Sequence, residues 1–201
     1  METKEKILET AARSFAKRGF EGTRIDALAK EAGVNKATLY YHFKSKQEIF
    51  EAVLARNFLA LQKEIDDKLF SCATPEEKIA GFVDVMFARE RRDVLLIIRE
   101  IIDGGDNLSG EIIMLISAIK ARLHEILKEG KRQGVFGNDD PSSVMYLIVG
   151  VSDFYIMSEP FRRRWKEFQH TKSLSPIDMD EKEFVAKIKS VILNFVKKEG
   201  E

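Results

Sequence analysis

The chain has few of the residues that interrupt or cross-link a polypeptide. Among its 201 residues are four prolines and one cysteine, Cys72, which has no partner for an internal disulfide. A single thiol of this kind is typical of an intracellular protein, and we interpret it as packed rather than redox-active. The longest apolar run, residues 144–151, is shorter than the ~18 residues of a membrane helix. The first residues also lack the apolar stretch of a secretory signal, so a cytoplasmic protein is predicted.

The chain also lacks net charge, but its charges are unevenly distributed. Residues 1–46 carry ten Lys and Arg against six Asp and Glu, whereas the remaining residues carry 23 against 27. A basic first segment followed by an acidic remainder is the asymmetry expected if only the first segment meets nucleic-acid phosphates.

Helical signals run along the whole sequence. No proline occurs in residues 1–74, and helix starts are marked by Thr74-Pro75-Glu76-Glu77, by Ser45 to Glu48, and by Asp140 and Asp180. Residues 94–102 are apolar enough for a strand, but without a partner strand they predict a buried helix. The sequence predicts an all-α fold of about nine helices, at 3–18, 24–31, 35–42, 46–70, 75–91, 93–102, 109–130, 141–168 (broken near Pro160) and 180–198.

Residues 23–43 have the spacing of a helix-turn-helix. Thr23 is placed to cap a short helix, and Ala29 is small where two helices would cross. Gly33, four residues later, suits a tight turn with positive φ, and Asn35 is placed to cap the next helix. Leu39, six residues after Gly33, would anchor that second helix in the core. This order of residues predicts two short helices joined by a turn.

The second short helix carries many hydrogen-bonding side chains for its length. They are Lys36, Thr38, Tyr40, Tyr41 and His42, and the cations nearby are Arg24, Lys44 and Lys46. A plain helical hairpin would not need this composition, so the segment predicts DNA binding.

The residue identities extend this pattern to a known family. The matching residues are Gly19-Phe20, Thr23, Ile25-x-x-Leu28-Ala29-x-x-Ala32-Gly33-Val34 and Thr38-Leu39-Tyr40-Tyr41-His42-Phe43-x-x-Lys46. This motif, in about the first fifty residues, resembles the TetR family of bacterial repressors. The rest of the chain resembles the family only in length and in its all-helical pattern.

The resemblance implies roles for the matching positions. Lys36, Ala37 and Thr38 would meet base edges, and Ala37 replaces a glycine frequent in relatives. The tyrosines and histidine that follow would contact phosphate or bases. Lys46 would clamp a phosphate at the start of the fourth helix, and Thr23 matches a capping residue that often touches phosphate. The predicted DNA contacts are Thr23, Arg24, Lys36, Ala37, Thr38, Tyr40, Tyr41, His42 and Lys46.

Two apolar seams in the second half of the chain are candidates for a homodimer interface. Two-fold pairing would let two recognition helices read a palindromic operator. Both seams would also suit an ordinary core, but in the resembled family the last two long helices dimerise. The predicted interface residues are Val144, Leu147, Ile148, Val151, Tyr155, Phe184, Ile188, Val191, Ile192 and Phe195.

The middle helices are rich in aromatic and sulfur side chains that suit either a core or a pocket for an apolar or amphipathic effector. Arg99 and Asp153 lie within apolar helices and need partners if they are buried. The predicted ligand-binding residues are Phe82, Met86, Arg99, Met114, Tyr146 and Asp153. An adaptor with the same DNA-binding segment and no small ligand is the alternative, and it predicts a well-filled core.

The predicted organisation is a DNA-binding domain at residues 1–46 and a ligand-binding and dimerisation domain at residues 47–201. An enzyme is not expected. Glu167-x-x-His170 matches only half of a di-iron motif, and the sequence has no second copy, no phosphate-binding glycine loop and no Cys/His cluster. No cofactor and no metal are therefore predicted. The predicted function is a dimeric, ligand-released repressor.

Overall fold

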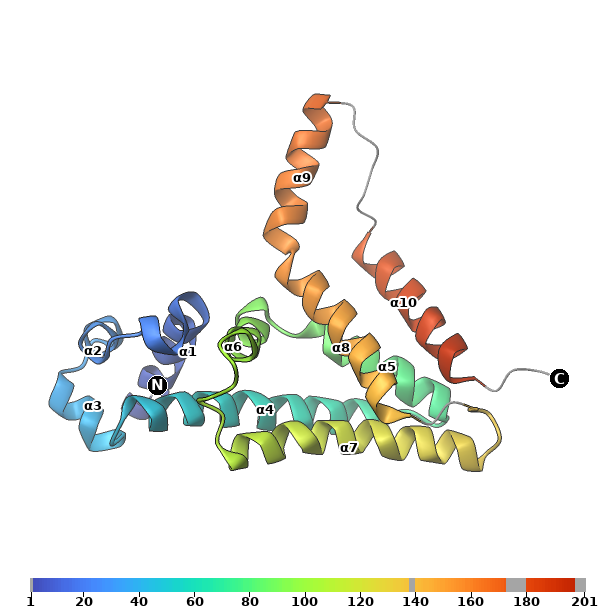
Figure 1. The fold of residues 1–201 in the computed structure, drawn as a ribbon, viewed down its shortest axis with the longest axis horizontal. Coiled ribbons are helices and arrows are strands. Elements are labelled where there is room, and N and C mark those ends of the chain that lie inside the picture. Colours follow the sequence, from blue (N-terminus) through green and yellow to red (C-terminus); the bar gives the residue numbers. More distant parts are fainter. Residues whose placement is uncertain (1, 138–139, 173–179, 198–201) are drawn as a thin grey trace. The chain divides into compact units, whose positions relative to one another are not determined.

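The computed structural model of the chain describes residues 2–137, 140–172 and 180–197; the side chains of 169–172, and with them that of His170, lie outside this description. Within this part the chain forms ten helices and no strand (Figure 1). They are α1 (Thr3–Gly22), α2 (Ile25–Ala32), α3 (Lys36–His42), α4 (Lys46–Phe70), α5 (Pro75–Ala88), α6 (Arg91–Ile102), α7 (Gly110–Arg132), α8 (Pro141–Met157), α9 (Glu159–Lys172) and α10 (Glu181–Val196). The all-α prediction is confirmed.

Capping residues set most of the predicted helix starts. The Thr74 hydroxyl accepts from the backbone N–H of Glu77, whose side chain accepts from the Thr74 N–H, so α5 begins with a complete capping box. The carboxylates of Asp140 and Asp180 accept from backbone N–H groups in the first turns of α8 and α10. These bonds satisfy backbone N–H groups that have no acceptor within the helix. For this reason, the positions of short polar residues in the sequence predicted where these helices begin.

The segment predicted to be helical over residues 141–168, with a break near Pro160, forms two helices, so the predicted break is confirmed. Ser158 ends α8, and Pro160 lies in the first turn of α9, where proline is tolerated because its missing N–H would have no intrahelical acceptor. The two axes are bent by 54° at this break. In the described part of the chain, no single helix has the length and hydropathy of a membrane span; α8 and the start of α9 pass that test only as this bent pair.

The chain packs as two compact units. The first contains Met1–Leu61 and Glu90–Ser117, and the second contains Gln62–Arg89 and Ala118–Glu201. These units are defined by packing, whereas the boundary predicted after residue 46 concerns which residues meet DNA. That functional division stays a prediction.

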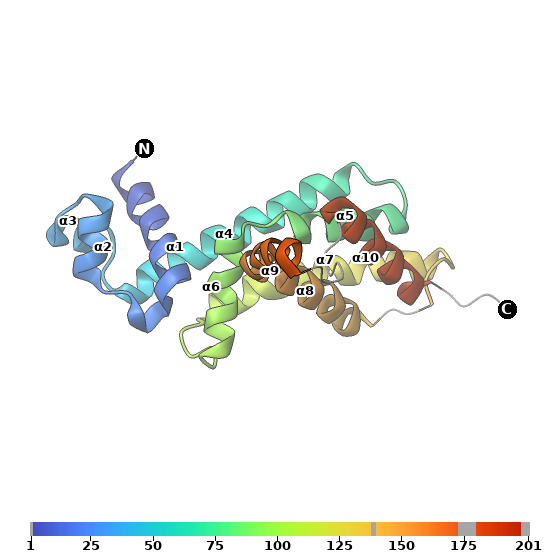
Figure 2. The same cartoon turned by 90° about the horizontal axis from the view of Figure 1, so that it is seen from above.

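In the first unit, α1 packs against α2 and α6, and α2 packs against α3 (Figure 2). Phe15, Phe20 and Phe50 bring their rings within 4.9 to 6.0 Å of one another and join α1 to the start of α4. Residues 94–102 are helical as predicted, but the expectation of a buried helix is wrong. Only Val94, Leu96 and Glu100 of α6 are buried, and Ile101 and Ile102 at its C-terminal end are exposed.

In the second unit, α5 packs against α8 and α10, and α8 packs against α10 and α9. Phe87 on α5, Tyr155 on α8 and Phe184 on α10 form a cluster of rings in which the tyrosine and Phe184 stack at 4.6 Å. The side chains of Arg89 and Asp153 are nearly buried and form an ion pair. In the described residues of this unit, an aromatic cluster and a nearly buried ion pair therefore join α5 to α8.

Replacing Gly130 with alanine is expected to destabilise the chain by about 1–3 kcal/mol. Gly130 lies within α7, where alanine would ordinarily add about 1 kcal/mol of helix stability. Here an added Cβ would stand 2.0 Å from a ring atom of Phe136, which is buried. The ring must therefore leave its site. Urea unfolding measures the effect, with Gly110→Ala as the control because nothing lies within 4 Å of its added Cβ. Equal stability of the two variants would contradict the prediction.

Candidate nucleic-acid interface

The turn between α2 and α3 depends on Gly33. This residue has φ 65° and ψ 35°, in the left-handed region, and its N–H donates to the carbonyls of Ala29 and Lys30 at the end of α2. The N–H of Val34 also donates to the Ala29 carbonyl, at 3.0 Å. This arrangement turns the chain from α2 into α3 over residues 33–35, and an L side chain at the glycine would be strained.

Helix α3 is fixed at its start and along one face. The Asn35 side chain accepts from the backbone N–H of Thr38 at 2.7 Å, as the sequence predicted. Leu39 is fully buried, and Phe43 beyond the end of the helix is buried as well. The cap and these two buried side chains together hold α3 in place within its unit.

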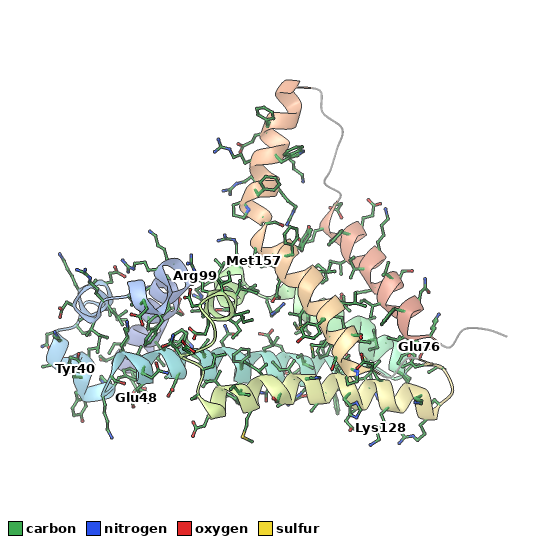
Figure 3. All side chains as sticks on the ribbon, in the orientation of Figure 1. Tyr40, Glu48, Glu76, Arg99, Lys128 and Met157 are labelled. Carbon is green, nitrogen blue, oxygen red and sulfur yellow. The ribbon has the colours of Figure 1, made fainter. Side chains whose placement is uncertain are left out.

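The opposite face of α3 is open to solvent. Tyr41 is 86% exposed, Tyr40 is 43% exposed and projects from the helix, and Lys36 and Ala37 are exposed (Figure 3). The rings of Tyr41 and His42 meet edge to face, with their centres 5.2 Å apart. The structure thus brings the residues predicted on α3 onto one short helix, where only Thr38 and His42 among them are half-buried.

Lys36 is held by a carboxylate on the preceding helix. Its Nζ lies 2.8 Å from Oδ1 of Asp26, and both side chains are exposed. The hydrogen bond to Asp26, and then the charge attraction, raise the pKa of Lys36, so the ammonium is charged at neutral pH. A base edge would have to compete with Asp26 for this group. The spacing of the helix-turn-helix residues did not predict the ion pair between Lys36 and Asp26.

Lys46 fastens the start of α4 to the end of α1. Its Nζ donates to the Phe20 carbonyl at 3.0 Å, lies 3.8 Å from the Glu21 carboxylate and stands 4.1 Å from the centre of the Phe20 ring. An ammonium has three donors, so the bond to Phe20 leaves donors for a phosphate oxygen. The predicted phosphate contact stays a prediction.

The prediction that Thr23 caps α2 is wrong. The N-cap is Arg24, which makes no side-chain capping bond. Thr23 is buried, and its hydroxyl donates to the Gly19 carbonyl at 2.8 Å. Gly19 has φ 74°, so regular helix in α1 stops there, and this carbonyl needs a donor that Thr23 supplies. Arg24 itself is exposed.

The residues predicted for a dimer interface occupy different environments. Val144, Ile148 and Ile192 are buried within the chain's own second unit. Leu147, Val191 and Phe195 are exposed; Val151, Tyr155, Phe184 and Ile188 are half-buried.

Helix α8 also exposes Tyr146 at 80% and Phe154 at 70%. These two residues are eight positions apart, or two steps of four, so they lie on roughly the same face of the helix. Phe154 is not among the interface residues predicted from the sequence. The helix is apolar on all sides, so the spacing of its residues does not show which face is covered.

The residues predicted for a ligand site are divided between the two units. Arg99 and Met114 belong to the first unit, and the other four, Phe82, Met86, Tyr146 and Asp153, belong to the second. Phe82 and Met86 are core residues.

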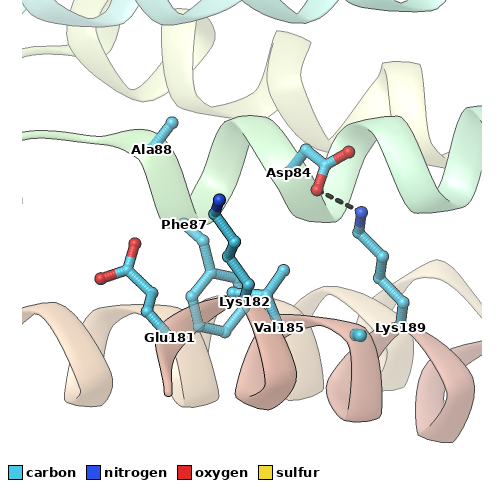
Figure 4. Close-up of a pocket in the computed structure, with 8 residues that line it drawn as sticks. Asp84, Phe87, Ala88, Glu181, Lys182, Val185 and Lys189 are labelled. Atoms are coloured by element: carbon cyan, nitrogen blue, oxygen red, sulfur yellow. Dashed lines mark ion pairs between the residues drawn. The ribbon is translucent and has the colours of Figure 1, made fainter.

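A hollow of about 290 Å³ lies elsewhere in the second unit, between α5 and α10 (Figure 4). Phe87 and Val185 supply its apolar part, and Asp84 and Lys189 form an ion pair at its edge. None of the predicted ligand residues lines this hollow.

An all-helical fold with a tight α2–α3 turn and an exposed, polar α3 defines a helix-turn-helix DNA-binding protein. Residues 7–53 match the model of bacterial regulatory proteins of the tetR family. These residues are therefore similar to that family of regulators, and the match covers the helix-turn-helix of α2 and α3. In the described residues no group of His, Cys, Asp and Glu is arranged to hold a metal.

Three known proteins illustrate the extent of the similarity. The HTH-type transcriptional regulator YhgD of Bacillus subtilis is 27% identical over 137 residues, covering 65% of this chain and 72% of that protein. The negative transcriptional regulator IcaR of Staphylococcus aureus is 46% identical over 48 residues, so the match spans 24% of this chain and only about a quarter of IcaR. The structure of AibR in complex with isovaleryl coenzyme A and operator DNA has a TM-score of 0.68 at 20% identity, over 98% of both chains.

Proposed function

We propose that the chain is a homodimeric repressor that binds a palindromic operator through α3 and is released by a small apolar or amphipathic ligand. The observation that carries the DNA-binding part is the outward face of α3, where Tyr40 and Tyr41 are exposed while Leu39 holds the helix in place. Residues 1–46 would bind DNA, and residues 47–201 would serve the ligand and the dimer. The activity belongs in the cytoplasm, where bacterial DNA lies.

In this proposal the residues of α3 divide by task. Lys36, Ala37 and Thr38, in the first turn, meet base edges and choose the sequence. Tyr40, Tyr41 and His42, with Arg24 and Lys46, contact phosphate and fix the register. Repression is supported by IcaR, a negative regulator that is 46% identical to this chain over 48 residues.

The dimer is proposed to form through α8 and α10. These helices pack together in the second unit and expose the large apolar side chains Tyr146, Phe154, Val191 and Phe195. Apolar side chains gathered on a surface mark interaction sites, and a two-fold contact would bury this face twice. A pair of recognition helices would then read two half-sites about 34 Å apart or a multiple of that distance.

The ligand is proposed to act by shifting the population of two subunit arrangements, only one of which fits successive major grooves. AibR supports this proposal, since a chain of the same fold was crystallised with both a thioester of coenzyme A and operator DNA. The ligand residues predicted from the sequence remain part of the proposal.

Selection of bound sequences from random DNA tests the function, and replacement of Tyr41 and Lys36 tests the assignment. The wild-type chain is expected to select a palindrome. Tyr41→Ala should lower affinity for it by about 10–100-fold, because a DNA contact is lost and no core contact is. Lys36→Gln should change the preferred base at one position of each half-site.

The matched control is Phe70→Ala, which removes a 94% exposed aromatic ring at the end of α4. It should leave DNA affinity unchanged. Recovery of unrelated sequences by the wild-type chain would overturn the proposal, and a Lys36→Gln variant that loses affinity equally for every sequence would refute its role in base choice.

A further inference from the structure

A cationic hollow lies between α1 and α6, within the first compact unit. Its volume is about 380 Å³, within the range of small-molecule sites. Five of its seven lining side chains are cationic: Arg13, Lys17, Arg91, Arg92 and Arg99. Ala16 and Leu95 supply the rest of the lining, and no lining residue is acidic.

Nearby carboxylates offset only part of this charge. Glu9 on α1 lies 3.2 Å from Arg13 and 2.6 Å from Arg92. Arg92 also lies 3.2 Å from Asp93 and 3.3 Å from Glu90. In the described part of the chain, neither Lys17 nor Arg99 has a carboxylate at ion-pair distance. The hollow therefore keeps an excess of positive charge.

Arg99 is positioned for an anion by the backbone of α1. Its Nε donates to the Ala16 carbonyl at 2.7 Å, near the point where Gly19 ends the regular part of α1. This bond satisfies a carbonyl at a helix C-terminus, where a cation is favoured, and it fixes the plane of the guanidinium. The Nη groups remain to donate in the fork geometry that suits phosphate oxygens. The sequence predicted a partner for Arg99 without identifying it.

We propose that this hollow binds the phosphate groups of a small effector that carries a diphosphate or a longer polyphosphate. The proposal rests on the proposed function, because it assigns the anionic part of the effector to the DNA-binding unit. A single carboxylate would neutralise one of the five cations, whereas a diphosphate brings several charges and more acceptor oxygens. Arginine in preference to lysine at four of the five positions also fits phosphate recognition.

The location of the hollow couples it to DNA binding. The anion would touch α1 through Arg13 and Lys17, and α1 packs against α2 of the helix-turn-helix. If the anion changes operator affinity by some factor, the operator changes affinity for the anion by the same factor.

Calorimetric titration of the full chain with inorganic pyrophosphate and with ATP, both without DNA, tests the site. At least one of them is expected to bind saturably. Lys17→Gln and Arg91→Gln should each raise its Kd by about tenfold, as expected for the loss of one charge-assisted hydrogen bond. Lys17 and Arg91 are exposed, so these replacements spare the core. The control is Lys128→Gln, which removes an exposed cation of α7 in the second unit.

Binding of both anions supports a site for phosphate alone, and binding of ATP only supports one that also holds a nucleoside. Absence of saturable binding, or an equal loss in Lys128→Gln, overturns the proposal. It is also overturned if neither anion binds and Lys17→Gln weakens operator binding, because the cations would then serve DNA phosphates. Saturable, Lys17-dependent binding by a chain that selects no operator would instead contradict the proposed function and leave the site standing.

Discussion

Replacing Phe154 with glutamate is expected to convert the proposed dimer into monomers and to lower affinity for a palindromic operator by at least about 100-fold. Phe154 is 70% exposed on α8 in the single chain, so its replacement costs little within one subunit. A two-fold interface contains the residue twice, and burying a phenylalanine side chain stabilises by about 1.5–3 kcal/mol. Losing both contacts weakens dimerisation by about 100- to 10,000-fold, before the cost of burying two carboxylates.

The loss of operator affinity follows from the loss of the second recognition helix. A monomer would contact one half-site, with half of the phosphate and base contacts. Sedimentation velocity gives the oligomeric state, titration of labelled operator gives the affinity, and circular dichroism checks that the helices are retained. The control is Phe70→Glu, which places the same charge at an exposed aromatic position on α4. A Phe154→Glu chain that remains dimeric with unchanged operator affinity would exclude this face from the interface.

Among the residues of α8 and α10 that were predicted to form a dimer interface, the structure distinguishes those that belong to the core of one chain from those that are exposed and available to a partner. Val144 and Ile148 of α8 are buried inside one chain, so they hold α8 in the core and have little area left for a partner. Phe184 of α10 is half-buried against the ring of Tyr155. The exposed Val191 and Phe195 lie farther along α10. The same helices can thus build the core with one face and offer the other to a second copy.

Features determined by neighbours in sequence were the predictable ones. The Asn35 cap, the positive φ of Gly33 and the capping box at Thr74 each depend on atoms within four residues, and each was predicted correctly. The helix-turn-helix was predictable for the same reason. Its spacing follows from a turn, a cap and one inward side chain, all local in sequence.

Features determined by residues far apart in sequence were not predictable. The cationic hollow joins Arg13 and Lys17 to residues of α6 that are some eighty positions away, and no periodicity signals such a pairing. Helix α8 is apolar on every side, so its pattern could not separate the buried Val144 from the exposed Phe154. The sequence also showed that Asp153 needs a partner, but only the fold identifies it as Arg89.

The ion pair between Arg89 and Asp153 connects the end of α5 to the middle of α8. Arg89 is the C-cap of α5; its Nε donates to the Met86 carbonyl at 2.9 Å, and Nη2 donates to the Ser152 hydroxyl at 3.1 Å and to the Asp153 carboxylate. Both charged side chains are nearly buried. Burial raises the pKa of Asp153, while the charge and hydrogen bond of Arg89 lower it, and burial has the larger effect.

This balance determines how stability depends on pH. Because the pKa of Asp153 is higher in the folded chain than in the unfolded chain, its contribution to stability is fully present below the unfolded pKa of about 3.9. The contribution is lost as pH rises through the folded pKa. Removing Arg89 would raise the folded pKa further and carry this loss to higher pH.

Arg89→Met is therefore expected to destabilise the chain by about 3–5 kcal/mol at pH 8, because it leaves an unpaired buried carboxylate, and by less at pH 5. The double variant Arg89→Met/Asp153→Leu removes both charges and should be at least as stable as the wild type, since well-packed apolar residues often replace a buried pair without loss. Urea unfolding of the three chains at both pH values measures these differences. If the double variant were as unstable as Arg89→Met, the loss would come from the bonds to Met86 and Ser152 rather than from the stranded charge.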